Sequence, residues 1–336
     1  MKRDPKNIGK SLCQRPPVSD EIQEHVYRTM LRYGIDKVTI AIAFLLLCAQ
    51  LLIYISVTDA SAPSHLTIGF TGSAFQDVSN TDIKAAVSML IQKVAFKYFD
   101  KAESHYYENL TNMVADMRNG KVQVFTTPVE EFMELRKMIP LDPILATSSA
   151  NGTEMELLLL TRKNSGIHSI WDLKGKSIVI PKRNPKYRTL FQIWLESMLY
   201  GKGYDTMEDF FSTVKEANTT SKAILPVFFR QAEACVVTRQ VLNLTTEMNP
   251  QINRELAVIA SKGKLAQGII AVDRRLPEET KERMKQAFLT LHETPDGEQL
   301  LMLFKVKKLI PIPSGYLKGT EDLYAQCKKN KNRATR

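Results

Sequence analysis

Cysteine and histidine are scarce in this sequence, with 4 and 5 residues among 336. So few cysteines exclude a disulfide scaffold. The histidines show no metal-ligand spacing, and neither Cys-x-x-Cys nor His-Glu-x-x-His occurs. We therefore expect no metal site.

Motifs of catalysis are also lacking. There is no Gly-x-Ser-x-Gly elbow and no Asp-x-Asp pair. Gly175-Lys176-Ser177 resembles the end of a phosphate-binding loop, but position 170 carries Ile instead of the required Gly, and the tripeptide leads into a predicted strand. The sequence predicts no catalytic residue and no cofactor, which indicates a protein that is not an enzyme.

The net charge of +10 is unevenly distributed. Residues 1–37 contribute +3 and residues 328–336 contribute +5, so the remainder is nearly neutral. A basic face for nucleic acid is therefore not expected. We interpret residues 319–336 as a solvated basic tail.

Charged residues are absent between Lys37 and Asp59. Twenty apolar residues in a helix span about 30 Å, which is the thickness of a membrane's hydrocarbon core. Residues 38–58 therefore read as a transmembrane signal anchor behind a cytoplasmic arm at 1–37, with the rest of the chain outside the cytoplasm. Cleavage after 60–62 is the alternative, although Pro63 suits that position poorly.

Strand and helix patterns alternate beyond the anchor. Apolar runs predict strands at 66–70, 122–125, 144–146, 155–161, 177–180, 234–238, 256–260 and 268–272. Helical periodicity appears at 82–99, 109–117, 187–200 and 277–291. This order predicts an α/β architecture with mainly parallel sheets.

Three polar loops follow predicted strands, where open α/β sheets place their ligands. They are 71–75, 126–128 and 181–188, the last of which is rich in Lys and Arg. Backbone N–H groups at the helix starts, together with nearby hydroxyls, favour anions. The loops therefore predict a ligand site.

Four stretches, in order, resemble the phosphate/phosphite/phosphonate substrate-binding proteins of ABC transporters, which have the type II periplasmic-binding-protein fold. They are Arg118–Phe125, Ser165–Ile180 with its Asp-Leu-Lys-Gly-Lys run, Lys222–Cys235, and Leu276–Gly297 with its Thr-Pro-x-Gly turn. The resemblance covers about residues 66 to 312.

The resemblance implies two α/β lobes joined by a hinge of two crossing segments. We expect lobe 1 at 64–158, lobe 2 at 159–250, and a return to lobe 1 with C-terminal helices at 251–318. Matching position by position, the implied ligand-binding residues are Ser73, Ala74, Phe75, Thr126, Thr127, Asn184, Tyr187, Arg188, Thr189 and Thr238.

Some positions depart from the pattern of the resembled family. The third loop has cations where relatives have a Ser/Thr-rich turn, which makes Arg188 and Lys182 candidate anion contacts. Gln123 and Glu233 stand where Asp is frequent, and Arg230 stands where Gly is common. Cys235 and Cys327 are expected as a buried and an exposed thiol, with a disulfide as the alternative.

The sequence thus predicts a monomeric solute-binding protein that captures a small anion between its lobes for an ABC permease. We expect the predicted anchor to lie in a bacterial inner membrane, with the binding domain periplasmic or extracellular. A membrane-anchored sensor that signals to a partner is the alternative interpretation. A type II membrane transferase is a more remote one, since metal motifs are missing.

Overall fold

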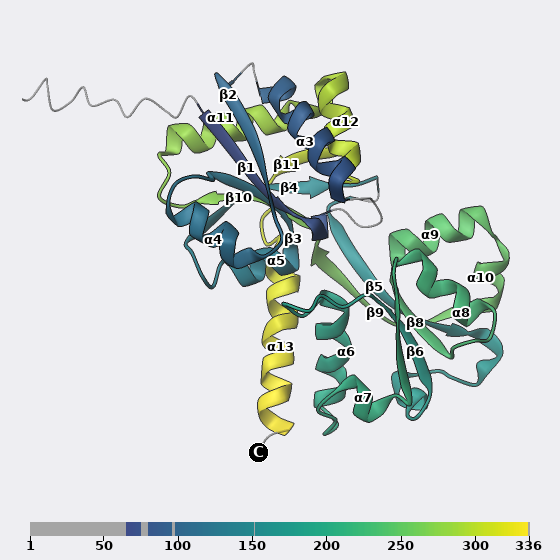
Figure 1. Ribbon diagram of the computed structural model, residues 1–336. Coiled ribbons are helices and arrows are strands. Elements are labelled where there is room, and N and C mark those ends of the chain that lie inside the picture. Colours follow the sequence, from purple (N-terminus) through teal and green to yellow (C-terminus); the bar gives the residue numbers. More distant parts are fainter. Residues whose placement is uncertain (1–64, 75–79, 96–97, 151, 335–336) are drawn as a thin grey trace, which may run out of the picture. The chain divides into compact units, whose positions relative to one another are not determined.

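The computed structural model describes residues 65–74, 80–95, 98–150 and 152–334 (Figure 1). Residues Ala62–Arg336 group as one compact unit. The anchor predicted at 38–58 lies outside the described residues. Among those that are described, no helix has the length and apolar character needed to cross a membrane.

Two mixed β-sheets, each covered by helices, define two lobes, which confirms the predicted two-lobe α/β architecture. In lobe 1 the strand order is β11-β4-β10-β3-β1-β2. These strands are β1 (His65–Thr71), β2 (Lys101–Tyr107), β3 (Val124–Pro128), β4 (Leu141–Ser148), β10 (Gly268–Asp273) and β11 (Lys308–Pro311).

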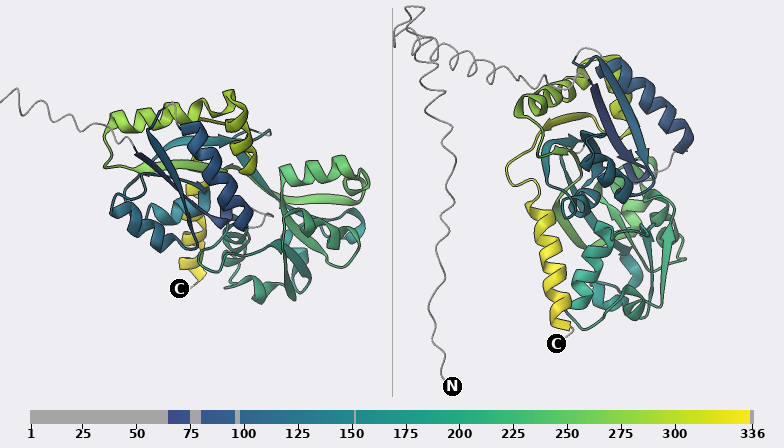
Figure 2. Two further views of the ribbon diagram at one scale, coloured as in Figure 1. Left: turned by 45° about the horizontal axis from the view of Figure 1, so that its top comes forward. Right: turned by 60° about the vertical axis from the view of Figure 1, so that its left-hand side comes forward.

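The helices of lobe 1 cover both faces of its sheet (Figures 1 and 2). They are η1 (Gly72–Ala74), α3 (Asn80–Ala95), α4 (Leu110–Arg118), α5 (Val129–Leu135), α11 (Glu278–Leu289), η5 (Leu291–Glu293) and α12 (Pro295–Leu303). Buried residues of α3, α11 and α12 pack with Ile68 and Val124 on one face. Those of α4 and α5 pack with Phe125 on the other, because side chains alternate along a strand.

Lobe 2 has the strand order β7-β6-β8-β5-β9. Its strands are β5 (Glu154–Arg162), β6 (Ser177–Pro181), β7 (Thr213–Ala217), β8 (Ala234–Thr238) and β9 (Leu256–Ala266). Its helices are η2 (Lys163–Ser165), η3 (Ile170–Leu173), α6 (Leu190–Tyr200), α7 (Met207–Phe210), η4 (Ser221–Ala223), α8 (Ile224–Phe228), α9 (Arg239–Met248) and α10 (Gln251–Glu255).

The expectation of mainly parallel sheets is only partly right. β1 pairs in parallel with β2 and β3, and β6 pairs in parallel with β7 and β8. The antiparallel pairs involve β4, β5, β9, β10 and β11. The reason is the connectivity. β4 carries the chain out of lobe 1 and β10 brings it back, while β5 and β9 do the same in lobe 2. Each of these two pairs is therefore antiparallel.

The chain changes sheet twice, between β4 and β5 and between β9 and β10. The second change occurs at Gln267, whose N–H donates to Tyr316 Oη at 3.0 Å and whose side chain donates to the carbonyl of Glu154 at 3.0 Å. The sheets therefore divide at 149–153 and at 267, whereas the sequence led us to expect boundaries at 158 and 250.

The last helix, α13 (Lys318–Ala334), lies beside α6 of lobe 2 (Figures 1 and 2). Leu323 and Cys327 on α13 are buried in a core cluster that also contains residues of both sheets. Residues 319–334 are thus part of a docked helix, unlike the solvated tail that we expected.

Candidate ligand site

A buried carboxylate lies where the first two strand-end loops of lobe 1 meet. Glu131 on α5 is 2% exposed. Its Oε2 accepts hydrogen bonds from Thr71 Oγ1 at 2.6 Å and from Thr127 Oγ1 at 2.8 Å. Its Oε1 accepts from Ser73 Oγ and from Tyr187 Oη, the latter at 2.8 Å. We call these five residues the Glu131 cluster.

Helix geometry explains how Glu131 reaches this place. It follows Thr127 by four residues, a spacing that brings a helical side chain back over the turn before it. The N–H of Val129 at the helix start donates to the carbonyl of Gln267 at 2.9 Å, and Val129, Phe132 and Leu135 are buried. The position of Glu131 is thus tied to the crossing segment between the lobes.

Tyr187 brings the third loop, which belongs to lobe 2, to the same point. Burial, with Glu131 and Glu130 nearby, raises the pKa of its phenol above the ordinary value. Its neighbour Lys186 donates from Nζ to the carbonyl of Glu108 in lobe 1 at 2.6 Å. The three loops predicted from strand ends therefore converge, and Ser73, Thr127 and Tyr187 share one partner.

The electrostatics of the cluster are acidic. None of the ion pairs among the described residues involves Glu131. Glu130, the preceding residue on α5, is half-buried, and its burial, with Glu131 next to it, raises the pKa of its carboxyl to about 7. The hydroxyls can stabilise the charge of Glu131, but no described cation neutralises it.

The other third-loop residues have partners away from Glu131. Arg188 donates to Glu196 at 2.7 Å and contacts Cys327 Sγ at 3.6 Å. Asn184 accepts from the N–H of Lys186, which closes the turn. In the described part of the chain, Lys182 is exposed and forms no ion pair.

Two predicted hydroxyls in lobe 2 cap helices. Thr189 caps α6 in a reciprocal box with Gln192, and Thr238 caps α9 by accepting from the N–H of Val241. Within the described residues, no hydrogen bond joins either threonine to the Glu131 cluster. Thr238 lies at the end of β8, and Thr189 lies at the start of α6; neither belongs to this cluster.

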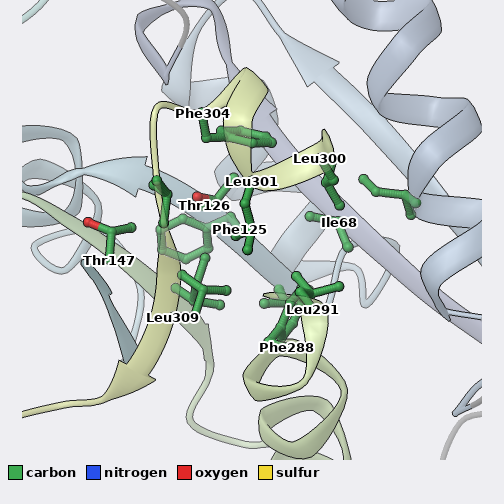
Figure 3. Close-up of a pocket in the computed structure, with 14 residues that line it drawn as sticks. Ile68, Phe125, Thr126, Thr147, Phe288, Leu291, Leu300, Leu301, Phe304 and Leu309 are labelled. Atoms are coloured by element: carbon green, nitrogen blue, oxygen red, sulfur yellow. The ribbon is translucent and has the colours of Figure 1, made fainter. Parts of the chain in front are cut away.

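The remaining predicted residues lie elsewhere in lobe 1. Thr126 faces the opposite side of β3 from Thr127 and lines a small apolar hollow with residues such as Phe304 and Leu301 (Figure 3). Ala74 ends η1, and Phe75 lies outside the described residues. The hollow of Figure 3 is part of the hydrophobic core and offers almost no polar group to a ligand.

A second hollow is open and polar. It is lined in lobe 1 by Lys84, Tyr106, Asn109, Asn112 and Asp116, among others. The ammonium of Lys84 lies 3.8 Å from the centre of the Tyr106 ring. Lys84 is thus already engaged with an aromatic face, which weakens the case for this hollow as the main anion site.

The positions that departed from the resembled family have local structural roles. Gln123 Oε1 accepts from the N–H of Thr67 at 2.7 Å, and Glu233 accepts from the N–H and hydroxyl of Ser177. Arg230 adopts φ +60° just after α8, a conformation that favours glycine.

Both described cysteines are free and buried. The expectation of an exposed Cys327 is therefore wrong, because α13 docks on α6 and covers the thiol. The described residues contain no group of three or more His, Cys, Asp or Glu side chains that could hold a metal ion.

Two cluster residues, Glu131 and Thr71, were not among the predicted ligand-binding residues, although Thr71 belongs to the first predicted loop. Glu131 was missed altogether. Its signal was present: a carboxylate four residues after the second loop's threonine, in the first turn of the helix that begins there. We interpreted the loops only as hydrogen-bond donors for an anion, so an acidic residue in that position was not considered.

Comparison with known proteins places this arrangement in context. The family model described as the periplasmic substrate-binding protein of phosphonate ABC transporters matches residues 73–314. No match is found among the curated proteins.

Solved structures share the fold at low sequence identity. The Xanthomonas citri protein XAC2383, bound to ATP, superposes with a TM-score of 0.59 at 15% identity, over 80% of this chain and 98% of that one. A binding protein of a Pseudomonas aeruginosa ABC phosphonate transporter gives 0.56 at 14%, over 82% and 89%. PhnD1 of Prochlorococcus marinus, in complex with methylphosphonate, gives 0.55 at 18%, over 80% and 99%.

Proposed function

We propose, since this chain belongs to the family of periplasmic substrate-binding proteins of phosphonate ABC transporters, that its two lobes hold a small solute bearing an oxyanion of the phosphonate type. The observation that carries the proposal is the hydrogen bond from Tyr187 of lobe 2 to Glu131 of lobe 1. Glu131 also accepts hydrogen bonds from the first and second loops, so all three strand-end loops meet at this carboxylate. A ligand that contacts both lobes would bind there.

The third loop is the best candidate for the oxyanion. Lys182 is exposed and without an ion pair in the described part of the chain, and the loop leads into the N-terminus of α6. The dipole at the start of a helix favours an anion there. Arg183 and Arg188 are held by Glu216 and Glu196, so we assign them to the support of the loop rather than to the ligand.

Ligand exchange requires the lobes to separate. The segments that cross between the sheets are short, and hinge motion at such segments is the usual way in which two-lobed binding proteins open. The polar contacts to break include those of Tyr187 with Glu131 and of Lys186 with Glu108. The ligand would then close the lobes by contacting both of them.

Calorimetry with a panel of oxyanions tests this function. Methylphosphonate, phosphite, phosphate and a short alkylphosphonate would be titrated into the folded protein. We expect at least one to bind with a dissociation constant below about 1 mM, which corresponds to about 4 kcal/mol of binding free energy. If none binds while the circular dichroism spectrum and thermal unfolding remain those of a folded protein, the proposal fails.

We further propose that residues 38–58 anchor the protein in the membrane, with the binding unit on the extracytoplasmic side for delivery to an ABC permease. The support is the uncharged apolar segment and the cations that precede it. Extraction of membranes with alkaline carbonate tests the anchor: an anchored protein stays in the membrane pellet, whereas release into the supernatant contradicts it.

A further inference from the structure

We infer that the outer end of lobe 2 is a docking surface for the anionic headgroups of a lipid bilayer, of the phosphatidylglycerol class. The residues that form it are Trp171, Lys174, Lys202, Lys328, Lys329 and Arg333, and we call them the basic end. The inference goes beyond solute binding. It rests on the proposed membrane anchor only for the nearness of a bilayer.

The first step concerns the charges of α13. The three cations that this helix contributes to the basic end are exposed, and within the described residues none of them forms an ion pair. No acidic residue follows Asp322 in the sequence. The opposite face of the helix is docked on lobe 2, since Cys327 is buried and Asn330 Nδ2 donates to the carbonyl of Ser197 at 2.7 Å. Docking therefore presents the cations together on an outward face.

The second step concerns two neighbouring turns, which add cations beside aromatic rings. Lys202 follows α6, and its Nζ lies 5.6 Å from the centre of the Trp171 ring. The Nζ of Lys174 lies 5.5 Å from the centre of the Tyr204 ring. Trp171 is 41% exposed, although its ring packs against Phe210. An exposed tryptophan among lysines is typical of surfaces at the boundary between membrane and water.

The third step concerns the acids near the basic end, which do not cancel its charge. Asp172 and Asp209 accept hydrogen bonds from backbone N–H groups, and Glu208 pairs with Arg183. Asp205 is exposed, but it is outnumbered by the five cations of the basic end. Residues 328–336 alone contribute +5 of the net charge of +10. A negatively charged surface is therefore attracted to this end of the molecule.

The basic end lies away from the solute site. α6 begins just after the third loop and ends at Tyr200, close to Lys202. α13 runs beside α6, and its contact with Ser197 is near that far end of α6 (Figures 1 and 2). A bilayer at the basic end would thus leave the strand-end loops open to solute.

A bilayer is the polyanion that the proposed anchor brings within reach. Residues 59–64 lie between the anchor and β1 of lobe 1, and six residues span at most about 20 Å. Lobe 1 would then stay near the membrane, so lobe 2 meets the surface at a high effective concentration. Each Lys or Arg near an anionic surface strengthens the contact by about fivefold, which makes five cations sufficient.

Quenching of tryptophan fluorescence tests the inference with the full-length protein reconstituted in vesicles. The sequence has two tryptophans, and Trp194 is buried, so Trp171 reports on the basic end. The vesicles contain acyl chains that carry bromine, in phosphatidylcholine alone or with phosphatidylglycerol added. We expect at least about threefold more quenching with phosphatidylglycerol, and its loss at high salt, because salt screens exposed charges. Equal quenching in the two kinds of vesicle, or none in either, overturns the inference.

Two matched triple variants assign the contact to α13. Replacement of Lys328, Lys329 and Arg333 by Gln should remove the quenching that depends on phosphatidylglycerol. Replacement of Lys222, Lys307 and Lys308 by Gln should retain it, because these exposed lysines lie elsewhere and the net charge falls equally. Equal behaviour of the two folded variants overturns the assignment to α13.

Two further readouts separate this contact from the other proposals. Trp171→Phe should abolish the lipid-dependent signal, and a signal that persists would show that it does not come from the basic end. Solute binding by the α13 variant should equal that of the parent protein, whereas a large loss would contradict the separation of the two sites. Carbonate extraction tests the anchor independently, so failure of the anchor and failure of the docking surface are distinguishable.

Discussion

At the scale of single residues, Glu130 gives the protein a pH dependence near neutrality. Burial raises the pKa of this carboxyl to about 7 in the folded state, whereas an unfolded glutamate titrates near about 4.3. The folded state thus holds the proton more tightly. The contribution of Glu130 to stability is full below about pH 4.3, falls as the pH rises towards 7, and stays low above it.

Glu130→Gln tests this sign. We expect the melting temperature of the variant to exceed that of the parent protein by an amount that grows between pH 4.5 and pH 7 and then levels off. Thermal unfolding at several pH values measures it, with Glu134→Gln as the control that should show no such growth. A difference that is constant with pH, or that shrinks towards neutrality, would contradict the account.

Arg230 carries local backbone strain that glycine would relieve. Its φ of +60° is in the left-handed region, where a Cβ atom costs about 1–2 kcal/mol. Glycine loses more backbone entropy on folding than arginine does, which offsets part of this gain. Arg230→Gly should therefore raise the free energy of unfolding by about 0.5–1 kcal/mol. Chemical denaturation measures the change, and Arg230→Ala, which retains the Cβ, should show no gain; a loss of stability in Arg230→Gly would disprove the argument.

At the scale of elements, the docking of α13 depends on one close approach. A Cβ on Gly319 would lie 1.8 Å from the carbonyl oxygen of Lys264 on β9. Gly319→Ala must therefore push the helix away from the strand, and we expect a loss of about 1–3 kcal/mol in the free energy of unfolding. Gly201→Ala is the control, because its nearest contact is an ordinary 3.5 Å and its backbone is helical, so its effect should stay within about 0.5 kcal/mol. Equal effects of the two substitutions would show that the approach does not matter.

Local signals in the sequence predicted many elements well. Asn109 caps α4, Gly120 follows its end with φ +70°, and Pro277 precedes α11; these residue types favour such positions at helix ends. The docking of α13 was not predictable in this way. The buried residues of this helix are Thr320, Leu323 and Cys327, which stand among many charged residues in the sequence. The residues that they pack against are distant in sequence.

The residues of the candidate site were likewise predictable from the sequence only in part. The order of strands and helices predicted the three loops, and the family resemblance then pointed to Ser73, Thr127 and Tyr187 within them. The pairing of Arg188 with Glu196, and the place of Glu131 among the hydroxyls, depend on how separate loops fold towards each other. No periodicity in a single sequence reports such contacts.

At the scale of the whole molecule, the two lobes are coupled in three ways. Two segments cross between the sheets, a shared hydrophobic cluster contains residues of both, and α13 reaches lobe 1 through the ion pair of Glu321 with Arg136 at 2.6 Å. The Glu131 cluster lies at the polar contact between the lobes. Closure of the lobes and occupation of the site would therefore be one event.

A crystal structure with methylphosphonate bound tests this account most directly. We predict that the phosphonate group contacts the loop from Pro181 to Thr189 in lobe 2 and that the same ligand contacts the loops of lobe 1 around the Glu131 cluster. A ligand held by one lobe alone, for example in the hollow beside Lys84 and Tyr106, would contradict the claim that solute is captured between the lobes.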